Sequence, residues 1–119
     1  MRFLVELAEN VGRRIPVRLV KGAYWDSEVK WAQEQGLESY PVFTRKAATD
    51  VAFLACARFM LEHDRDLYPQ FATHNAHTMA WLLEAGRGRE FEFQRLHGMS
   101  DGLYASLMEH CELPIPFRV

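Results

Sequence analysis

Short apolar segments that alternate with longer amphipathic segments predict an α/β fold for this chain. Three segments have the composition of buried strands, at residues 15–20, 68–72 and 90–96, and a fourth begins at 114–119. Because helical patterns separate them, the strands are expected to pair in parallel. A closed β/α barrel of the triosephosphate isomerase type needs eight strands and about 250 residues. The sequence therefore predicts part of such a barrel, incomplete in this chain, within a larger domain.

The first strand lies between two helices. Apolar residues recur at helical spacing over residues 4–11, and Gly12 stands where that helix should end. The branched and apolar strand at 15–20 should end at Gly22. These signals predict a helix, a turn and a strand in that order.

Two helices should follow the first strand. Asp26 or Ser27 is positioned to cap a short helix that ends at Gly36. Thr44 is positioned to cap the longest helix, at about residues 45–63, which carries an apolar stripe. The connection from the first strand to the second is therefore expected to be long and helical.

The second half of the chain repeats the strand and helix pattern. Asn75 should cap the helix that follows the second strand, and Gly86 should end it. The third strand alternates strictly at its start, and a helix at 101–110 should follow it.

Composition excludes several classes of function. The 119 residues are 49% hydrophobic and 25% charged, with a net charge of -2 and no basic run, so nucleic acid is not an expected partner. No apolar stretch approaches the roughly 20 residues that span a bilayer. Cys56 and Cys111 fit neither a metal spacing nor a disulfide framework. We therefore expect a cytoplasmic domain.

Arg18 is the most informative candidate site residue. It lies between Val17 and Leu19 in an otherwise apolar strand, so its guanidinium is expected to point into the barrel. A buried guanidinium needs an anionic or strongly accepting partner. That partner is either a carboxylate on a neighbouring strand or a bound cofactor or substrate.

Other candidates follow the strands, where β/α barrels place their reactive groups. Lys21 and Gly22 stand at the first strand exit, where glycine allows a ligand to approach the backbone. Tyr24 and Trp25 could flank a planar ligand, although such a pair is more often ordinary packing.

The second strand exit offers Thr73, His74 and Asn75 at a helix amino terminus, which favours phosphate groups. Simple capping by Asn75 is the alternative. His74, His77 and His97 could also converge and bind zinc, but the positive charges of nearby Arg18 and Lys21 oppose a bound cation.

Four stretches, in order, resemble the catalytic domain of proline dehydrogenase, in the form found in bacterial bifunctional proline utilisation proteins. They are VRLVKGAYWDSE at 17–28, YPVFTRK at 40–46, YPQFATHNAHT at 68–78 and EFQRLHGM at 92–99. Four long matches are far more specific than one short motif.

The resemblance implies a distorted β/α barrel, of which this chain carries the later strands, the fifth to the seventh and the start of the eighth. It implies an FAD-dependent enzyme that oxidises L-proline to pyrroline-5-carboxylate by hydride transfer, the first step of proline catabolism to glutamate. A membrane quinone is the electron acceptor that the family suggests, so the parent enzyme could be peripheral at the inner membrane. The oligomeric state stays open.

The resemblance also assigns residues. Arg18 corresponds to the catalytic arginine that hydrogen-bonds the flavin near its reactive nitrogen. The pocket for the proline ring corresponds to Ala23, Tyr24 and Leu96. The cofactor contacts correspond to Arg18, Lys21, Gly22, Ala23, Trp25, Thr44, Lys46, Thr73 and His74.

Some family features do not occur in these residues. An earlier lysine and aspartate are missing, and so is a late helix whose paired arginines hold the proline carboxylate. The isolated chain is therefore expected to be inactive, as a truncated gene product or an incomplete sequence. Two alternatives remain at this point: a zinc-dependent barrel hydrolase that uses His74, His77 and His97, and a non-catalytic truncated product.

Overall fold

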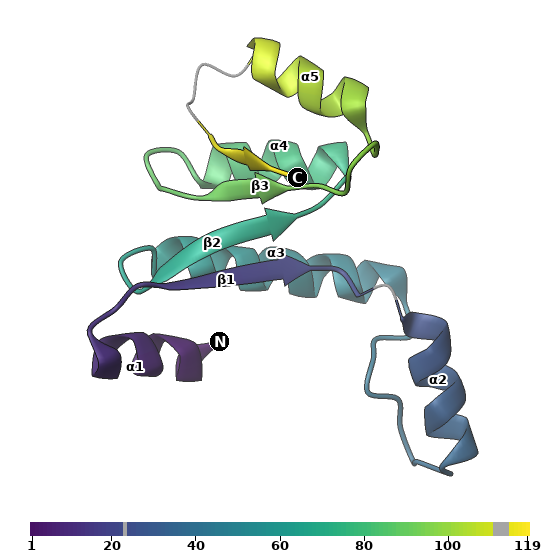
Figure 1. The fold of residues 1–119 in the computed structure, drawn as a ribbon. Coiled ribbons are helices and arrows are strands. Elements are labelled where there is room, and N and C mark those ends of the chain that lie inside the picture. Colours follow the sequence, from purple (N-terminus) through teal and green to yellow (C-terminus); the bar gives the residue numbers. More distant parts are fainter. Residues whose placement is uncertain (23, 111–114) are drawn as a thin grey trace.

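A computed structural model describes residues 1–22, 24–110 and 115–119 of the chain (Figure 1). Its strands form one sheet in the order β1-β2-β3-β4, and every neighbouring pair is parallel. The elements in chain order are α1 Arg2–Val11, β1 Ile15–Val20, α2 Trp25–Glu34, α3 Lys46–Glu62, β2 Leu67–Ala72, α4 Ala76–Ala85, β3 Glu92–Gln94, α5 Asp101–His110 and β4 Phe117–Arg118.

The order of the strands confirms the predicted α/β class. Successive strands are neighbours in the sheet and run in parallel, with a helix in each connection, which is the topology of a section of a β/α barrel. Helices α3 and α4 lie along one face of the sheet, whereas α2 lies beyond the carboxyl end of β1 (Figure 1). Among the described residues, no helix is both long and apolar enough to cross a membrane.

The two faces of the sheet differ in chemistry because side chains alternate along each strand. The face toward the helices is apolar and forms the core, where Phe71 and Phe93 are fully buried. Burying a side chain of this kind contributes roughly 1.5–3 kcal/mol to stability. The opposite face is polar, and Arg18, Gln70 and Glu92 lie on it in register across β1, β2 and β3.

Local signals predicted some element ends correctly. Gly12 adopts a left-handed conformation (φ 62°) at the end of α1, which favours glycine. The Asn75 side chain caps α4 by accepting a hydrogen bond from the backbone N–H of Thr78 at 2.9 Å. Cys56 is a free, partly buried thiol, while Cys111 lies outside the described residues.

Two predicted helix caps are wrong. Helix α2 begins after Tyr24, so Asp26 and Ser27 both lie inside its first turn and neither caps it. Helix α3 begins after Arg45, and Thr44 lies outside it. Neither N-cap residue makes a side-chain cap hydrogen bond.

The later strands are shorter than their apolar patterns predicted. Strand β3 covers Glu92–Gln94 within the predicted 90–96, and it ends where β2 ends, because Ala72 lies directly opposite Gln94. Strand β4 covers Phe117–Arg118 within the predicted 114–119, of which residue 114 lies outside the described residues.

Candidate functional site

A cavity of about 670 Å³ opens at the carboxyl ends of the four strands. This volume lies in the range of roughly 300–1,000 Å³ that small-molecule sites occupy. Six of the predicted site residues line it, from three strand exits and the start of α3: Arg18, Lys21, Lys46, Thr73, His74 and Leu96. Val20, Ala72, Asn75, Gln94, Arg95, Arg118 and Val119 complete the lining.

Arg18 lies on the predicted face but is not buried as predicted. Its side chain shares the polar face of the sheet with Gln70, yet it is exposed, because no described residue covers that face at β1. Within the described part of the chain, Arg18 forms no ion pair with a carboxylate. The internal salt bridge that the sequence left open is therefore absent there, and Glu92, a carboxylate on β3, binds Arg118.

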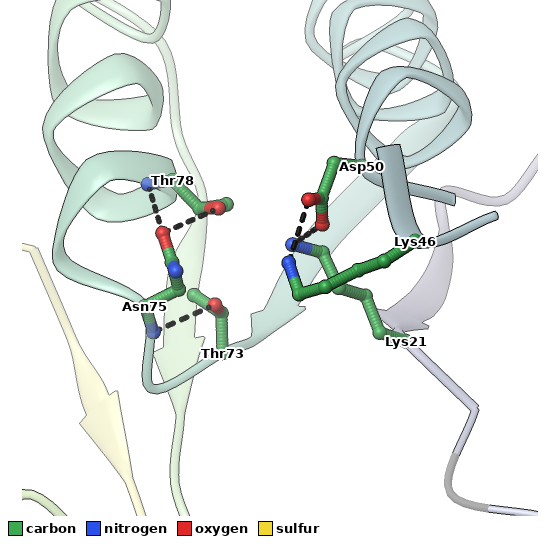
Figure 2. Close-up of polar contacts among 6 residues, drawn as sticks. All are labelled: Lys21, Lys46, Asp50, Thr73, Asn75 and Thr78. Carbon is green, nitrogen blue, oxygen red and sulfur yellow. Dashed lines mark hydrogen bonds and ion pairs between the residues drawn. The ribbon is translucent and has the colours of Figure 1, made fainter. Parts of the chain in front are cut away.

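Lys21 and Lys46 are brought together by a residue that the sequence analysis missed. The Asp50 carboxylate accepts a hydrogen bond from each ammonium group, with Nζ to Oδ distances of 2.6 Å to both (Figure 2). The bond from Lys21, followed by that from Lys46, lowers the pKa of Asp50 from 3.8 to about 2. The cluster therefore holds one negative and two positive charges at neutral pH. The spacing of four residues between Lys46 and Asp50 in a helix was the available signal.

The second strand exit is organised by side chains that bind backbone amides (Figure 2). Thr73, which is buried, accepts a hydrogen bond from the backbone N–H of Asn75 at 3.2 Å. Asn75 Oδ1 in turn accepts from both the N–H and the hydroxyl of Thr78. The predicted cap by Asn75 is thus confirmed, and the backbone N–H groups of Asn75 and Thr78 already have side-chain partners.

His74 links two strand exits. Its Nε2 accepts a hydrogen bond from the backbone N–H of Leu96 at 3.3 Å, and its ring lies at an angle to the ring of Tyr104. His77 and His97 are exposed. No three histidine, cysteine or acidic side chains gather as a metal site among the described residues, so the ligand set of the zinc alternative does not form.

The remaining predicted residues lie at the margin of the cavity or away from it. Tyr24 and Trp25 are 75% and 46% exposed and do not line it, and the Trp25 indole donates a hydrogen bond to the backbone oxygen of Phe43. Gly22 and Thr44 do not line it either, whereas Leu96 does and is 66% exposed. Ala23 lies outside the described residues.

Two residues that line the cavity, Gln94 and Arg118, belong to a polar network that the sequence analysis did not predict. Glu92 is 1% exposed and accepts hydrogen bonds from the side chains of Tyr68, Gln70, Gln94 and Arg118. Arg118 is the main reason that the pKa of Glu92 is lowered, and the pKa of Arg118 is raised in return. The alternation of polar and apolar residues around Glu92 was a usable signal. It places the Glu92 side chain on the other face of the strand from Phe91 and Phe93, which lie in the core.

Comparison with known proteins decides the family. The family model for proline dehydrogenase matches residues 1–119. The chain belongs to the proline dehydrogenase family. Among curated proteins, the bifunctional protein PutA of Klebsiella aerogenes is 54% identical over 89% of this chain, and that of Salmonella typhimurium is 57% identical over 86%. The PutA protein of Rhizobium meliloti is 48% identical over 98% of the chain.

Solved proline dehydrogenase relatives share the fold. A mutant of proline utilization A (PutA) from Bradyrhizobium japonicum matches 99% of this chain with a TM-score of 0.90 and 49% identity. PutA from Bdellovibrio bacteriovorus inactivated by N-propargylglycine matches 98% with a TM-score of 0.89 and 34% identity. The chain spans 12% of each of these structures and 8–10% of the curated relatives above. The resemblance read from the sequence is confirmed.

Proposed function

We propose that this chain forms part of an FAD-dependent enzyme that oxidises L-proline to pyrroline-5-carboxylate, the first step of proline breakdown to glutamate. The observation that carries the proposal is the proline dehydrogenase family match over all 119 residues. The cavity supports it, because six residues expected at a flavin or proline site line one space.

The lining suits a flavin dinucleotide. Apolar Val20 and Ala72 can contact a planar ring, while Arg18 and Lys21 provide positive charge for polar and anionic groups. When bound, the flavin supplies the chemistry, since it accepts a hydride from the carbon next to the proline nitrogen. The protein's task is to bind the flavin and proline, to orient them toward each other and to exclude water from the site.

Each cationic group has a distinct task in this proposal. The Arg18 guanidinium has no intramolecular partner in the described part of the chain, so its planar donors are available to the flavin ring. Lys21 and Lys46 share Asp50 and keep a net positive charge, which favours the diphosphate. Thr73 and His74 lie at the start of α4, where the helix dipole also favours negative charge.

Fewer of the described residues are available to contact proline than to contact the flavin. Leu96 presents an exposed apolar side chain to the cavity and can contact the proline ring, with Ala23 and Tyr24 assigned by the family resemblance. We also propose a membrane quinone as the electron acceptor and a cytoplasmic location, with the parent enzyme peripheral at the inner membrane.

A chimeric enzyme tests the proposal. Residues 1–119 would replace the superposed segment of full-length Bradyrhizobium japonicum PutA, which the close structural match permits. We expect the purified chimera to show a flavin absorption spectrum that L-proline bleaches without oxygen. Stoichiometric zinc with no flavin would instead revive the hydrolase alternative. A chimera that folds, as judged by circular dichroism, but holds no flavin would refute the proposal.

A further inference from the structure

A buried carboxylate contacts two residues that line the cavity, Gln94 and Arg118. Glu92 lies in the middle of the polar face of the sheet and is 1% exposed. A buried charge is costly unless it is paired and its remaining lone pairs accept hydrogen bonds. Both Glu92 oxygens meet that condition, so the residue is held ionised by its surroundings.

The hydrogen bonds come from three strands. Oε1 accepts from Gln70 Nε2 at 2.9 Å, from Gln94 Nε2 at 2.6 Å and from Arg118 Nε at 2.9 Å. Oε2 accepts from Arg118 Nη2 at 3.1 Å and from the Tyr68 hydroxyl at 3.3 Å. Arg118 therefore binds Glu92 through two nitrogens, the geometry that fixes a guanidinium most firmly.

This network determines what two lining residues present to the cavity. The side-chain nitrogen of Gln94 donates a hydrogen bond to Glu92, which leaves the side-chain oxygen of Gln94 as an acceptor. Arg118 uses Nε and Nη2 on Glu92, while its side chain stays 66% exposed and lines the cavity. Three guanidinium groups thus border the cavity, those of Arg18, Arg95 and Arg118. Glu92 neutralises that of Arg118, and the exposed Asp101 pairs with that of Arg95.

We propose that Glu92 is a positioning residue of the flavin site, which orients Arg118 and Gln94 and cancels the charge that Arg118 brings to the lining of the cavity. Arg18 then remains the uncompensated guanidinium of the described lining, since Arg95 pairs with Asp101. The inference rests on the proposed function, and it adds that the protein sets the charge at the flavin site through a pair on β3 and β4. A purely structural role, in which Glu92 only joins these strands, would leave the flavin's properties unchanged.

Charge substitutions in the holoenzyme chimera separate these roles. Glu92→Gln keeps the shape and leaves Arg118 uncompensated, so the flavin reduction potential should become more positive, because added positive charge favours the reduced flavin. Glu92→Asp keeps the negative charge, so the flavin reduction potential of this variant should stay near that of the parent chimera even if its unfolding free energy falls. The double variant E92Q/R118M removes both charges and should return toward the parent value.

Glu90→Gln is the matched control. Glu90 also pairs with an arginine, Arg14, and lies two residues from Glu92, but it is exposed and outside the cavity. The flavin reduction potential of the Glu90→Gln variant should equal that of the parent chimera.

The outcomes are distinguishable. A parent chimera without flavin overturns the proposed function and this inference with it. Bound flavin with equal potentials in the parent and Glu92→Gln overturns the inference alone. If Glu92→Gln does not fold, Arg118→Met at pH 8.5 takes its place. That variant leaves an unpaired carboxylate and should lower the potential, and an unchanged value would overturn the inference.

Discussion

Arg18→Met is the substitution that most directly tests the site. Arg18 is exposed and forms no ion pair within the described part of the chain, so its replacement leaves neither a cavity nor a buried unpaired charge. Surface substitutions of this kind change stability by roughly 0.5 kcal/mol or less. We therefore expect the unfolding free energy of the chain to be almost unchanged.

The effect on the ligand should be much larger. A hydrogen bond to a charged group is worth roughly 1.5–3 kcal/mol, which corresponds to about a 10- to 150-fold weaker flavin affinity. Loss of a cation beside the flavin should also lower its reduction potential and slow its reduction by proline. Methionine fills a similar length and lacks the planar donors.

Two measurements on Arg18→Met check this reasoning. Urea titration gives the stability, and flavin titration of the apo chimera gives the affinity. Wild-type affinity and potential would show that Arg18 does not contact the flavin. A stability loss above roughly 2 kcal/mol would show instead that Arg18 has a structural partner that its exposure does not reveal.

Four further predictions follow from the same contacts. Asn75→Ala should lower the unfolding free energy by about 1 kcal/mol, because the N–H of Thr78 loses its acceptor, as urea titration would show. His74→Ala in the chimera should weaken flavin retention and leave the metal content unchanged, measured by absorbance and elemental analysis; a loss of bound zinc would contradict this. The pKa of Glu92 is lowered below 4.5 in the folded chain, so its stabilising contribution is present above about pH 4.5 and is lost as the pH falls through the folded value. Urea midpoints should therefore fall more steeply in acid for the wild type than for Glu92→Gln, and parallel curves would refute this. Purified residues 1–119 should not turn over proline with a dye acceptor, because the polar face of the sheet stays open, and measurable turnover would contradict this.

The sequence alone determined the order and type of the elements. Strand and helix signals are local, since they depend on periodicity and on residues such as Gly12 and Asn75 at element ends, and both residues act as predicted. Five of the predicted residues on the strands or at their exits, Arg18, Lys21, Thr73, His74 and Leu96, also meet at one cavity. This was predictable because parallel strands bring their carboxyl ends to the same edge of a sheet.

Only the tertiary structure decided how these residues are paired. The contact of Lys21 with Asp50 and the pairing of Glu92 with Arg118 each join segments far apart in the sequence. The exposure of Arg18 likewise depends on whether other segments cover β1. Such pairs depend on strand register and on which face of the sheet remains uncovered, and a local pattern of residues specifies neither. For the same reason, the apolar patterns did not determine the bounds of β3 and β4, because those bounds depend on backbone hydrogen bonds to a neighbouring strand.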